Sequence, residues 1–106
     1  MTVYNKLVRD KIPEIIRQQG AEPLIRTLED EEYTDCLECK LDEEVAEYHR
    51  DKNVEELADI LEVVFALADH LGVSRDELMH VYCTKNEKRG GFLKRVFLIS
   101  KEDKTI

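Results

Sequence analysis

The residues best suited to chemistry in this chain are acidic and fall in two neighbouring stretches. The first stretch contains Glu43, Glu44 and Glu47, and the second contains Glu56 and Asp59. At 100° per residue, Glu44 and Glu47 lie on one side of a helix, while Glu43 points further toward solvent. Glu56 and Asp59 share a helix face in the same way. We therefore expect two helices, each of which carries a pair of carboxylates.

Carboxylates that converge beside a protein core repel one another, and something must offset the repulsion. Two unit charges about 5 Å apart repel by roughly 3 kcal/mol at an effective dielectric constant near 20. Protons offset this by raising the pKa values, and Mg²⁺ offsets it because it prefers hard oxygen ligands. A carboxylate-held Mg²⁺ keeps positions for phosphate oxygens and a nucleophilic water. The pattern thus fits a magnesium site for phosphate chemistry, with Mn²⁺ as a substitute ion.

A purely structural interpretation accounts for the same residues. Glu56 stands third after Asn53 and fits a capping box at a helix start. The glutamates of the first stretch fit a solvated helix face beside Lys40 and Arg50. Spacing alone leaves both interpretations open.

Proline, glycine and capping residues mark the ends of the expected helices. Pro13 suits the first turn of a short helix, and Asn53 and Ser74 each begin a capping box. Between them, apolar residues recur at helical spacing. The expected helices are a short one that ends before Gly20, one from Glu31 to about Asp51, one that Asn53 caps and that runs to Leu71, and one that Ser74 caps and that ends near Arg89.

Apolar residues cover most of the girth of the third expected helix, from Leu57 to Leu71. Such a helix must be surrounded, and a chain of 106 residues has few other helices to surround it. We expect one all-α domain over residues 1–106, a bundle of four to five helices completed by a homodimer or homotetramer. Residues 23–28 and 92–99 read as extended and β-prone, and could add a short β pair.

Charge and composition exclude several classes of function. With 24 acidic and 16 basic residues the net charge is −8, which disfavours binding to nucleic acid. No apolar run is long enough for a membrane span or a signal peptide, so we expect a cytoplasmic protein. The three cysteines are then free thiols, and the three histidines have no metal-ligand spacing.

Basic residues gather near the two ends of the chain. A triphosphate needs cations beyond the metal, and these clusters are the candidates for phosphate binding. Arg89 also precedes Gly90 and Gly91, whose small size and backbone N–H groups would let a phosphate approach closely. The same residues also suit the end of a helix, where the glycines cap it and the positive charges interact favourably with its dipole. The candidates are Lys6, Arg9, Lys11, Lys85, Lys88 and Arg89.

Several segments resemble one enzyme family. The EEVAE at residues 43–47 and the ELAD at residues 56–59 resemble the signature of the MazG-like all-α nucleotide pyrophosphohydrolases. The YNKLVRDKIPEII at residues 4–16 and the KNEKRGGF at residues 85–92 are similar to a small single-domain house-cleaning subgroup.

This resemblance implies a site and a reaction. The reaction is Mg²⁺-dependent hydrolysis of a nucleoside triphosphate, non-canonical or surplus, to the monophosphate and pyrophosphate. Glu43 would act in a supporting position or near the attacking water, and the subunits would pair into a helical bundle. The implied metal ligands are Glu44, Glu47, Glu56 and Asp59.

Two alternatives remain at this point. Phosphoribosyl-ATP pyrophosphohydrolase shares the acidic helical core, although not the segments that flank it here. A helical dimer without catalytic activity, which binds a nucleotide or a protein, would need the same bundle as an interaction module. Release of pyrophosphate separates the enzymes from the binding module.

Overall fold

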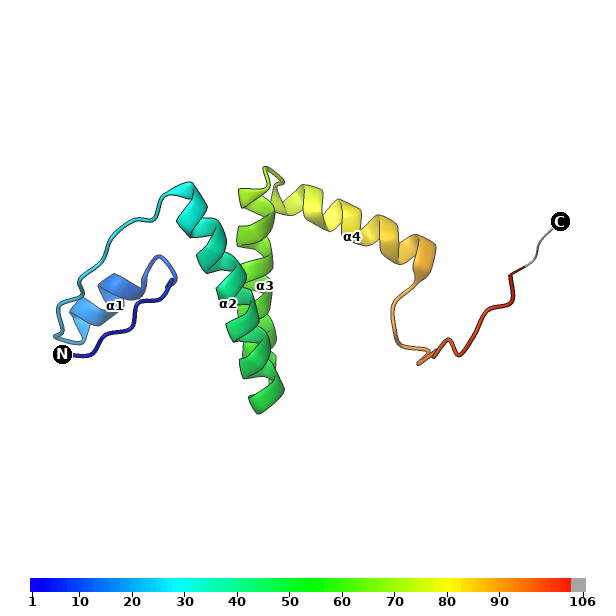
Figure 1. Ribbon diagram of the computed structural model, residues 1–106, viewed down its shortest axis with the longest axis horizontal. Coiled ribbons are helices and arrows are strands. Elements are labelled where there is room, and N and C mark those ends of the chain that lie inside the picture. Colours follow the sequence, from blue (N-terminus) through cyan, green and yellow to red (C-terminus); the bar gives the residue numbers. More distant parts are fainter. Residues whose placement is uncertain (104–106) are drawn as a thin grey trace. The chain divides into compact units, whose positions relative to one another are not determined.

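A computed structural model describes residues 1–103, and it is all-α there, as expected. Contacts divide the chain into two units, Met1–Ser74 and a second unit that begins at Arg75. The first unit holds three helices and the second holds one (Figure 1). The helices are α1 Ile12–Gln18, α2 Asp30–Asp51, α3 Val54–His70 and α4 Arg75–Arg89.

The helices α2 and α3 pack against each other along their lengths and form the centre of the first unit (Figure 1). The chain reverses between them at two residues. Lys52 is left-handed, with φ of 49°, and its N–H donates to Tyr48 O at 2.7 Å, which ends α2. The side chain of Asn53 then accepts a hydrogen bond from the Glu56 N–H at 3.0 Å, which caps α3. So short a connection makes the helices antiparallel.

The predicted helix boundaries are confirmed to within about one residue. Pro13 lies in the first turn of α1, where its missing N–H costs nothing. Gly72 follows α3 with φ of 82°, a conformation that glycine adopts without a Cβ clash. The differences are small: α2 begins at Asp30 rather than Glu31, and α3 ends at His70 rather than Leu71. Proline, glycine and capping residues therefore determine where the helices begin and end.

The buried apolar core of the described chain is small. Leu37 of α2 is 3% exposed, and Val63 and Ala68 of α3 are each 7% exposed. In contrast, Leu57 and Leu61 of α3 are 48% and 49% exposed. Part of the apolar surface of α3 thus remains about half exposed to solvent in the single chain.

The second unit contains α4 and an irregular segment after it, and here one expectation is wrong. The sequence offered residues 23–28 and 92–99 as segments that could add a short β pair, but residues 1–103 contain no strand. The side chains of Phe97 and Ile99 are 86% and 89% exposed. Because β propensity reflects packing on an existing sheet, apolar and β-branched residues do not form a strand without one.

Candidate metal centre

Two helices bring four carboxylates to one place. Glu44 and Glu47 lie one turn apart on α2, and Glu56 and Asp59 lie one turn apart at the start of α3. One oxygen from each of the four side chains lies within 4.8 Å of one from each of the others. The short reversal between α2 and α3 produces this, because it sets the last turns of one helix beside the first turns of the next. The predicted set of metal ligands is therefore brought together.

Part of this cluster is removed from solvent. Glu44 is only 6% exposed, which is rare for a glutamate unless it is paired or bound to a metal. The Oε2 atoms of Glu44 and Glu56 are buried and accept no hydrogen bond from the residues that the structure describes. A buried carboxylate oxygen without a donor is costly, and a cation at this point would satisfy it.

Two carboxyl groups of the cluster have raised pKa values. Burial raises the pKa of Glu44, and the nearby Glu47 raises it further. Burial also raises the pKa of Glu56, again with a contribution from Glu47. Both side chains thus bind protons more readily than an ordinary glutamate does. A divalent cation would compete for the same oxygens and reverse these shifts.

The donor set fits a hard divalent cation. Oxygen ligands on opposite sides of Mg²⁺ lie about 4.2 Å apart, twice the metal–oxygen distance of about 2.1 Å. The separations in the cluster reach no more than 4.8 Å, so small side-chain rotations would bring the four oxygens around one ion. Carboxylates alone favour Mg²⁺ or Mn²⁺ over softer metals, because no thiolate or imidazole is among them.

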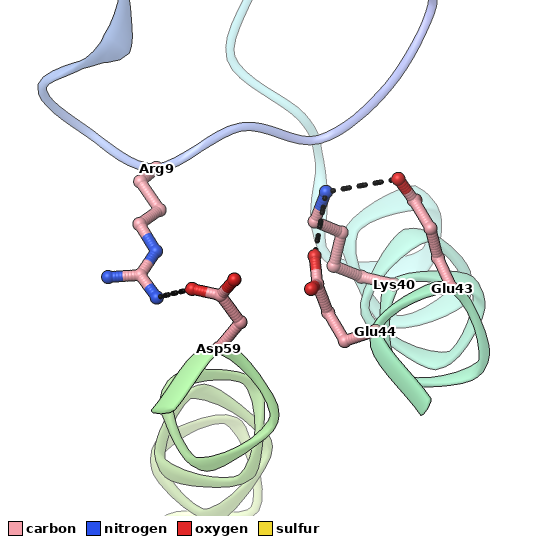
Figure 2. Close-up of polar contacts among 5 residues, drawn as sticks. All are labelled: Arg9, Lys40, Glu43, Glu44 and Asp59. Atoms are coloured by element: carbon pink, nitrogen blue, oxygen red, sulfur yellow. Dashed lines mark hydrogen bonds and ion pairs between the residues drawn. The ribbon is translucent and has the colours of Figure 1, made fainter. Parts of the chain in front are cut away.

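Two basic side chains contact carboxylates of the cluster or the neighbouring Glu43 (Figure 2). Nζ of Lys40 lies 3.4 Å from Oε1 of Glu44 and 3.5 Å from Oε1 of Glu43. A guanidinium N–H of Arg9, from the segment before α1, donates to Oδ1 of Asp59 at 2.6 Å. Each cation neutralises one side of the cluster and leaves the buried Oε2 of Glu44 without a partner.

Sequence reasoning missed the position of Lys40. The sequence named it only as a neighbour of the glutamates in the structural interpretation, whereas its side chain is only 17% exposed and contacts two of them. Its place four residues before Glu44 and three before Glu43 was the available signal, because side chains at these spacings meet on a helix. Glu43 is more open than Glu44, at 39% against 8% for the side chains, as the helical projection predicted.

Lys6 and Lys11 have surroundings that differ from those of Arg9. Lys6 lies over the ring of Tyr4, with Nζ 5.7 Å from the centroid, and Lys11 stands at the N-cap of α1. Their role in phosphate binding stays a prediction, as does that of the exposed α4 residues Lys85, Lys88 and Arg89.

A cavity of about 200 Å³ opens beside the cluster, between the segment before α1 and the helices α2 and α3. Glu44 and Asp59 line it, so a metal held there would be accessible from the cavity. Arg9 and Lys40 line it as well. Its apolar lining consists of Leu7, Val8, Leu37, Val63 and Ala66, with Tyr33 beside them.

The cysteines and histidines lie outside this centre. Cys36, Cys39 and Cys83 are free thiols, as expected. His70 shares a hydrogen bond with Thr34 Oγ1, and its ring packs edge-to-face with the Tyr33 ring. Within residues 1–103, the four carboxylates are the one group with the spacing for a metal ion.

Comparison with known proteins adds little about function. The chain matches no known family model and no solved structure. A protein of Mycolicibacterium smegmatis (strain ATCC 700084 / mc(2)155), described as uncharacterized, is 64% identical over 42 residues, which are 40% of this chain. The match covers 43% of that relative, so the chain spans less than half of its length. No helix within residues 1–103 has the length and apolar character needed to cross a membrane.

Proposed function

We propose that this protein is a Mg²⁺-dependent nucleoside-triphosphate pyrophosphohydrolase of the MazG-like kind. The observation that carries the proposal is the convergence of Glu44, Glu47, Glu56 and Asp59, within 4.8 Å, beside an open cavity. The resemblance of residues 43–47 and 56–59, which contain the same carboxylates, to the family signature also supports it. The substrate would be a non-canonical or surplus nucleoside triphosphate, which a house-cleaning enzyme removes from the cytoplasm.

The chain's own residues can be given distinct tasks in this reaction. The four clustered carboxylates would hold Mg²⁺, which when bound polarises phosphate oxygens and lowers the pKa of a water. The water oxygen would bond to the α phosphorus, the bond from that phosphorus to the oxygen bridging the α and β phosphates would break, and pyrophosphate would leave with the bridging oxygen. Glu43, which is half open to solvent, is available to orient the water and accept its proton.

Negative charge grows on the departing pyrophosphate, and cations near it lower the barrier. Among the basic candidates, Arg9 is the one that this role suits best, because it donates to Asp59 and lines the cavity. The remaining candidates for this role are Lys6, Lys11, Lys85, Lys88 and Arg89.

A homodimer or homotetramer is part of the proposal. The half-exposed Leu57 and Leu61 of α3 support it, because a largely apolar helix is stable only where it is covered. The small core of the single chain supports it too, since short helical chains often complete their cores with another copy.

A nucleotide panel tests the proposal. Purified protein is incubated with canonical and non-canonical nucleoside triphosphates and with phosphoribosyl-ATP, in Mg²⁺, Mn²⁺ or EDTA, and pyrophosphate and monophosphate are measured. We expect equal amounts of the two products with either metal and none in EDTA. Glu47→Gln and Asp59→Asn should abolish release without unfolding the protein, and Glu38→Gln, another glutamate of α2, serves as the matched control.

The same panel identifies the competing functions. Turnover confined to phosphoribosyl-ATP would assign the protein to histidine synthesis instead. If isothermal titration detects nucleotide binding but no nucleotide yields pyrophosphate, the protein is a binding module and the enzymatic proposal is wrong. Full activity in Glu47→Gln or Asp59→Asn would remove that residue from the site.

A further inference from the structure

Lys40 occupies an unusual place for a lysine, because it is largely buried and contacts two carboxylates of its own helix (Figure 2). Its side chain is 17% exposed and lines the cavity beside the carboxylate cluster. The family signature and the basic clusters near the chain ends leave this residue without a role. A lysine is rarely buried unless its charge is paired, so we asked which groups the ammonium of Lys40 can pair with.

The contacts of Lys40 are loose. Its Nζ lies 3.4 Å and 3.5 Å from the two glutamates, whereas charge-assisted hydrogen bonds are typically about 2.7–2.9 Å long. Arg9, in comparison, approaches Asp59 at 2.6 Å. The ammonium group of Lys40 therefore balances charge between two carboxylates without being locked to either. Its flexible four-carbon stem leaves it free to turn toward the cavity.

Metal binding would remove the reason for Lys40 to stay with Glu44. Oε1 of Glu44 faces Lys40, while its buried Oε2 has no donor among the described residues. A divalent cation bound by this carboxylate would satisfy it and repel the ammonium group. Phosphate oxygens carried by the metal would enter the cavity that Lys40 lines. The ammonium group would then lie nearer to an anion than to an unpaired carboxylate.

We propose that Lys40 exchanges partners: it neutralises Glu44 in the free protein, and it binds a phosphate oxygen of the ligand once the metal is held. The inference rests on the proposed function, because it assumes that a metal and a phosphate ligand meet at this cluster. It adds a phosphate-binding residue from α2 to the basic candidates near the chain ends. Lys40 then opposes binding of the metal alone and favours binding of the metal together with phosphate.

Two binding measurements on Lys40→Met test the exchange. The first is Mn²⁺ binding to the protein alone, by electron paramagnetic resonance. The second is binding of methylenebisphosphonate, a pyrophosphate analogue that is not hydrolysed, by isothermal titration in saturating Mg²⁺. We expect Mn²⁺ to bind about fivefold more tightly, because a competing cation is gone. We expect the bisphosphonate to bind about tenfold more weakly, because a charged donor is lost.

Matched variants separate this exchange from a general effect of charge or packing. Lys40→Arg keeps the positive charge and should retain bisphosphonate binding within about threefold. Lys52→Met removes a lysine at the end of the same helix, where Nζ lies 5.8 Å from the centre of the Tyr48 ring, and should change neither affinity. Lys40→Gln gives a second readout if Lys40→Met lowers the melting temperature strongly.

The direction of the two changes decides the outcome. Opposite changes in Lys40→Met, with neither in Lys52→Met, support the exchange, even if no nucleotide is hydrolysed. Unchanged affinities, or equal losses of both, overturn it and make Lys40 a structural residue. A wild-type protein that binds no Mn²⁺ overturns the metal site itself, and with it both the proposed function and this inference.

Discussion

Arg9 and Asp59 lie 50 positions apart in the sequence, yet the arginine donates to the aspartate at 2.6 Å. This contact attaches the segment before α1 to the first turns of α3 (Figure 2). Both residues line the cavity. Both side chains remain open, at 55% and 39% exposure. Exposed ion pairs contribute little to folding. The position of Arg9 is therefore better explained by the site than by the stability of the fold.

Arg9→Met should reduce activity far more than stability. Loss of an exposed pair costs about 0.2–1 kcal/mol, which lowers the melting temperature by no more than a few degrees. Pyrophosphate release should fall by about tenfold, because a cation near the phosphates is lost. Calorimetry and the pyrophosphate assay measure the two effects.

Arg26→Met is the matched control for Arg9→Met. Arg26 pairs with Glu32 through two hydrogen bonds, and its side chain is 68% exposed, but it does not line the cavity. This variant should show a similar small loss of stability with unchanged activity. Equal losses of activity in the two variants would contradict a role for Arg9 at the site.

Glu44→Gln should stabilise the metal-free protein while it abolishes the response to metal. The substitution removes a buried charge whose pKa is raised by burial and by Glu47. In EDTA the melting temperature should rise by about 4 °C, the shift that 1 kcal/mol produces in a domain of this size. Wild-type protein at 100 times the dissociation constant for Mg²⁺ should gain about 2.7 kcal/mol, and the variant should gain nothing. A lower melting temperature of the variant in EDTA would contradict the prediction, because burial and Glu47 would then cost the Glu44 carboxylate less than its contact with Lys40 contributes.

The metal-free protein should lose stability as the pH rises above 4.5, the ordinary pKa of glutamate. Glu44 and Glu56 have raised pKa values in the folded state, so that state binds protons more tightly than the unfolded chain. The stabilisation is present at low pH and is lost as the pH rises through the raised values. Saturating Mg²⁺ should abolish this loss, because the metal replaces the protons.

Melting temperatures measured from about pH 5 to pH 8 in EDTA and in Mg²⁺ test this dependence. Glu32 and Asp51 do not obscure it. Hydrogen bonds from Arg26 and Arg50 lower their pKa values from 4.5 and 3.8, so their contributions are lost only at more acid pH. Identical profiles in EDTA and Mg²⁺ would mean that the metal does not displace these protons.

The sequence predicted what depends on local rules and missed what depends on distant contacts. Asn53, Gly72 and Pro13 act on their immediate neighbours, so the helix ends could be placed to within about one residue. The meeting of Glu44 with Asp59 followed from helical spacing and a tight reversal. The pairing of Arg9 with Asp59 could not be found this way, because a non-helical segment of the chain brings it about.

Lys40 and residues 92–99 illustrate two other limits. A lysine stem is long enough to place the charge in solvent or beside a carboxylate, and spacing alone did not decide between them for Lys40. The β-prone residues 92–99 form no strand, because strand formation depends on the partner and not on the segment alone.

Asn53→Ala should weaken both the fold and the site. The Asn53 side chain caps α3 through the Glu56 N–H at 3.0 Å, and loss of such a cap costs about 1 kcal/mol. Because the cap belongs to the turn that carries Glu56, its loss should also weaken Mn²⁺ binding, measured by electron paramagnetic resonance. Asn53→Ser retains an acceptor and should restore both properties. Unchanged Mn²⁺ affinity in a destabilised Asn53→Ala protein would separate the cap from the metal site.

Leu61→Asp should convert an oligomer into a monomer. Leu61 is 49% exposed in the single chain, on a helix that is apolar around most of its girth, and a charge buried in an interface between copies would be strongly unfavourable. Light scattering should give a multiple of the chain mass for the wild type and the single mass for the variant. Leu24→Asp, on a fully exposed residue outside the helices, is the control and should keep the wild-type mass. A monomeric wild type at high concentration would contradict assembly through this face, and the metal site would then have to form within one chain, as the distances among its four carboxylates allow.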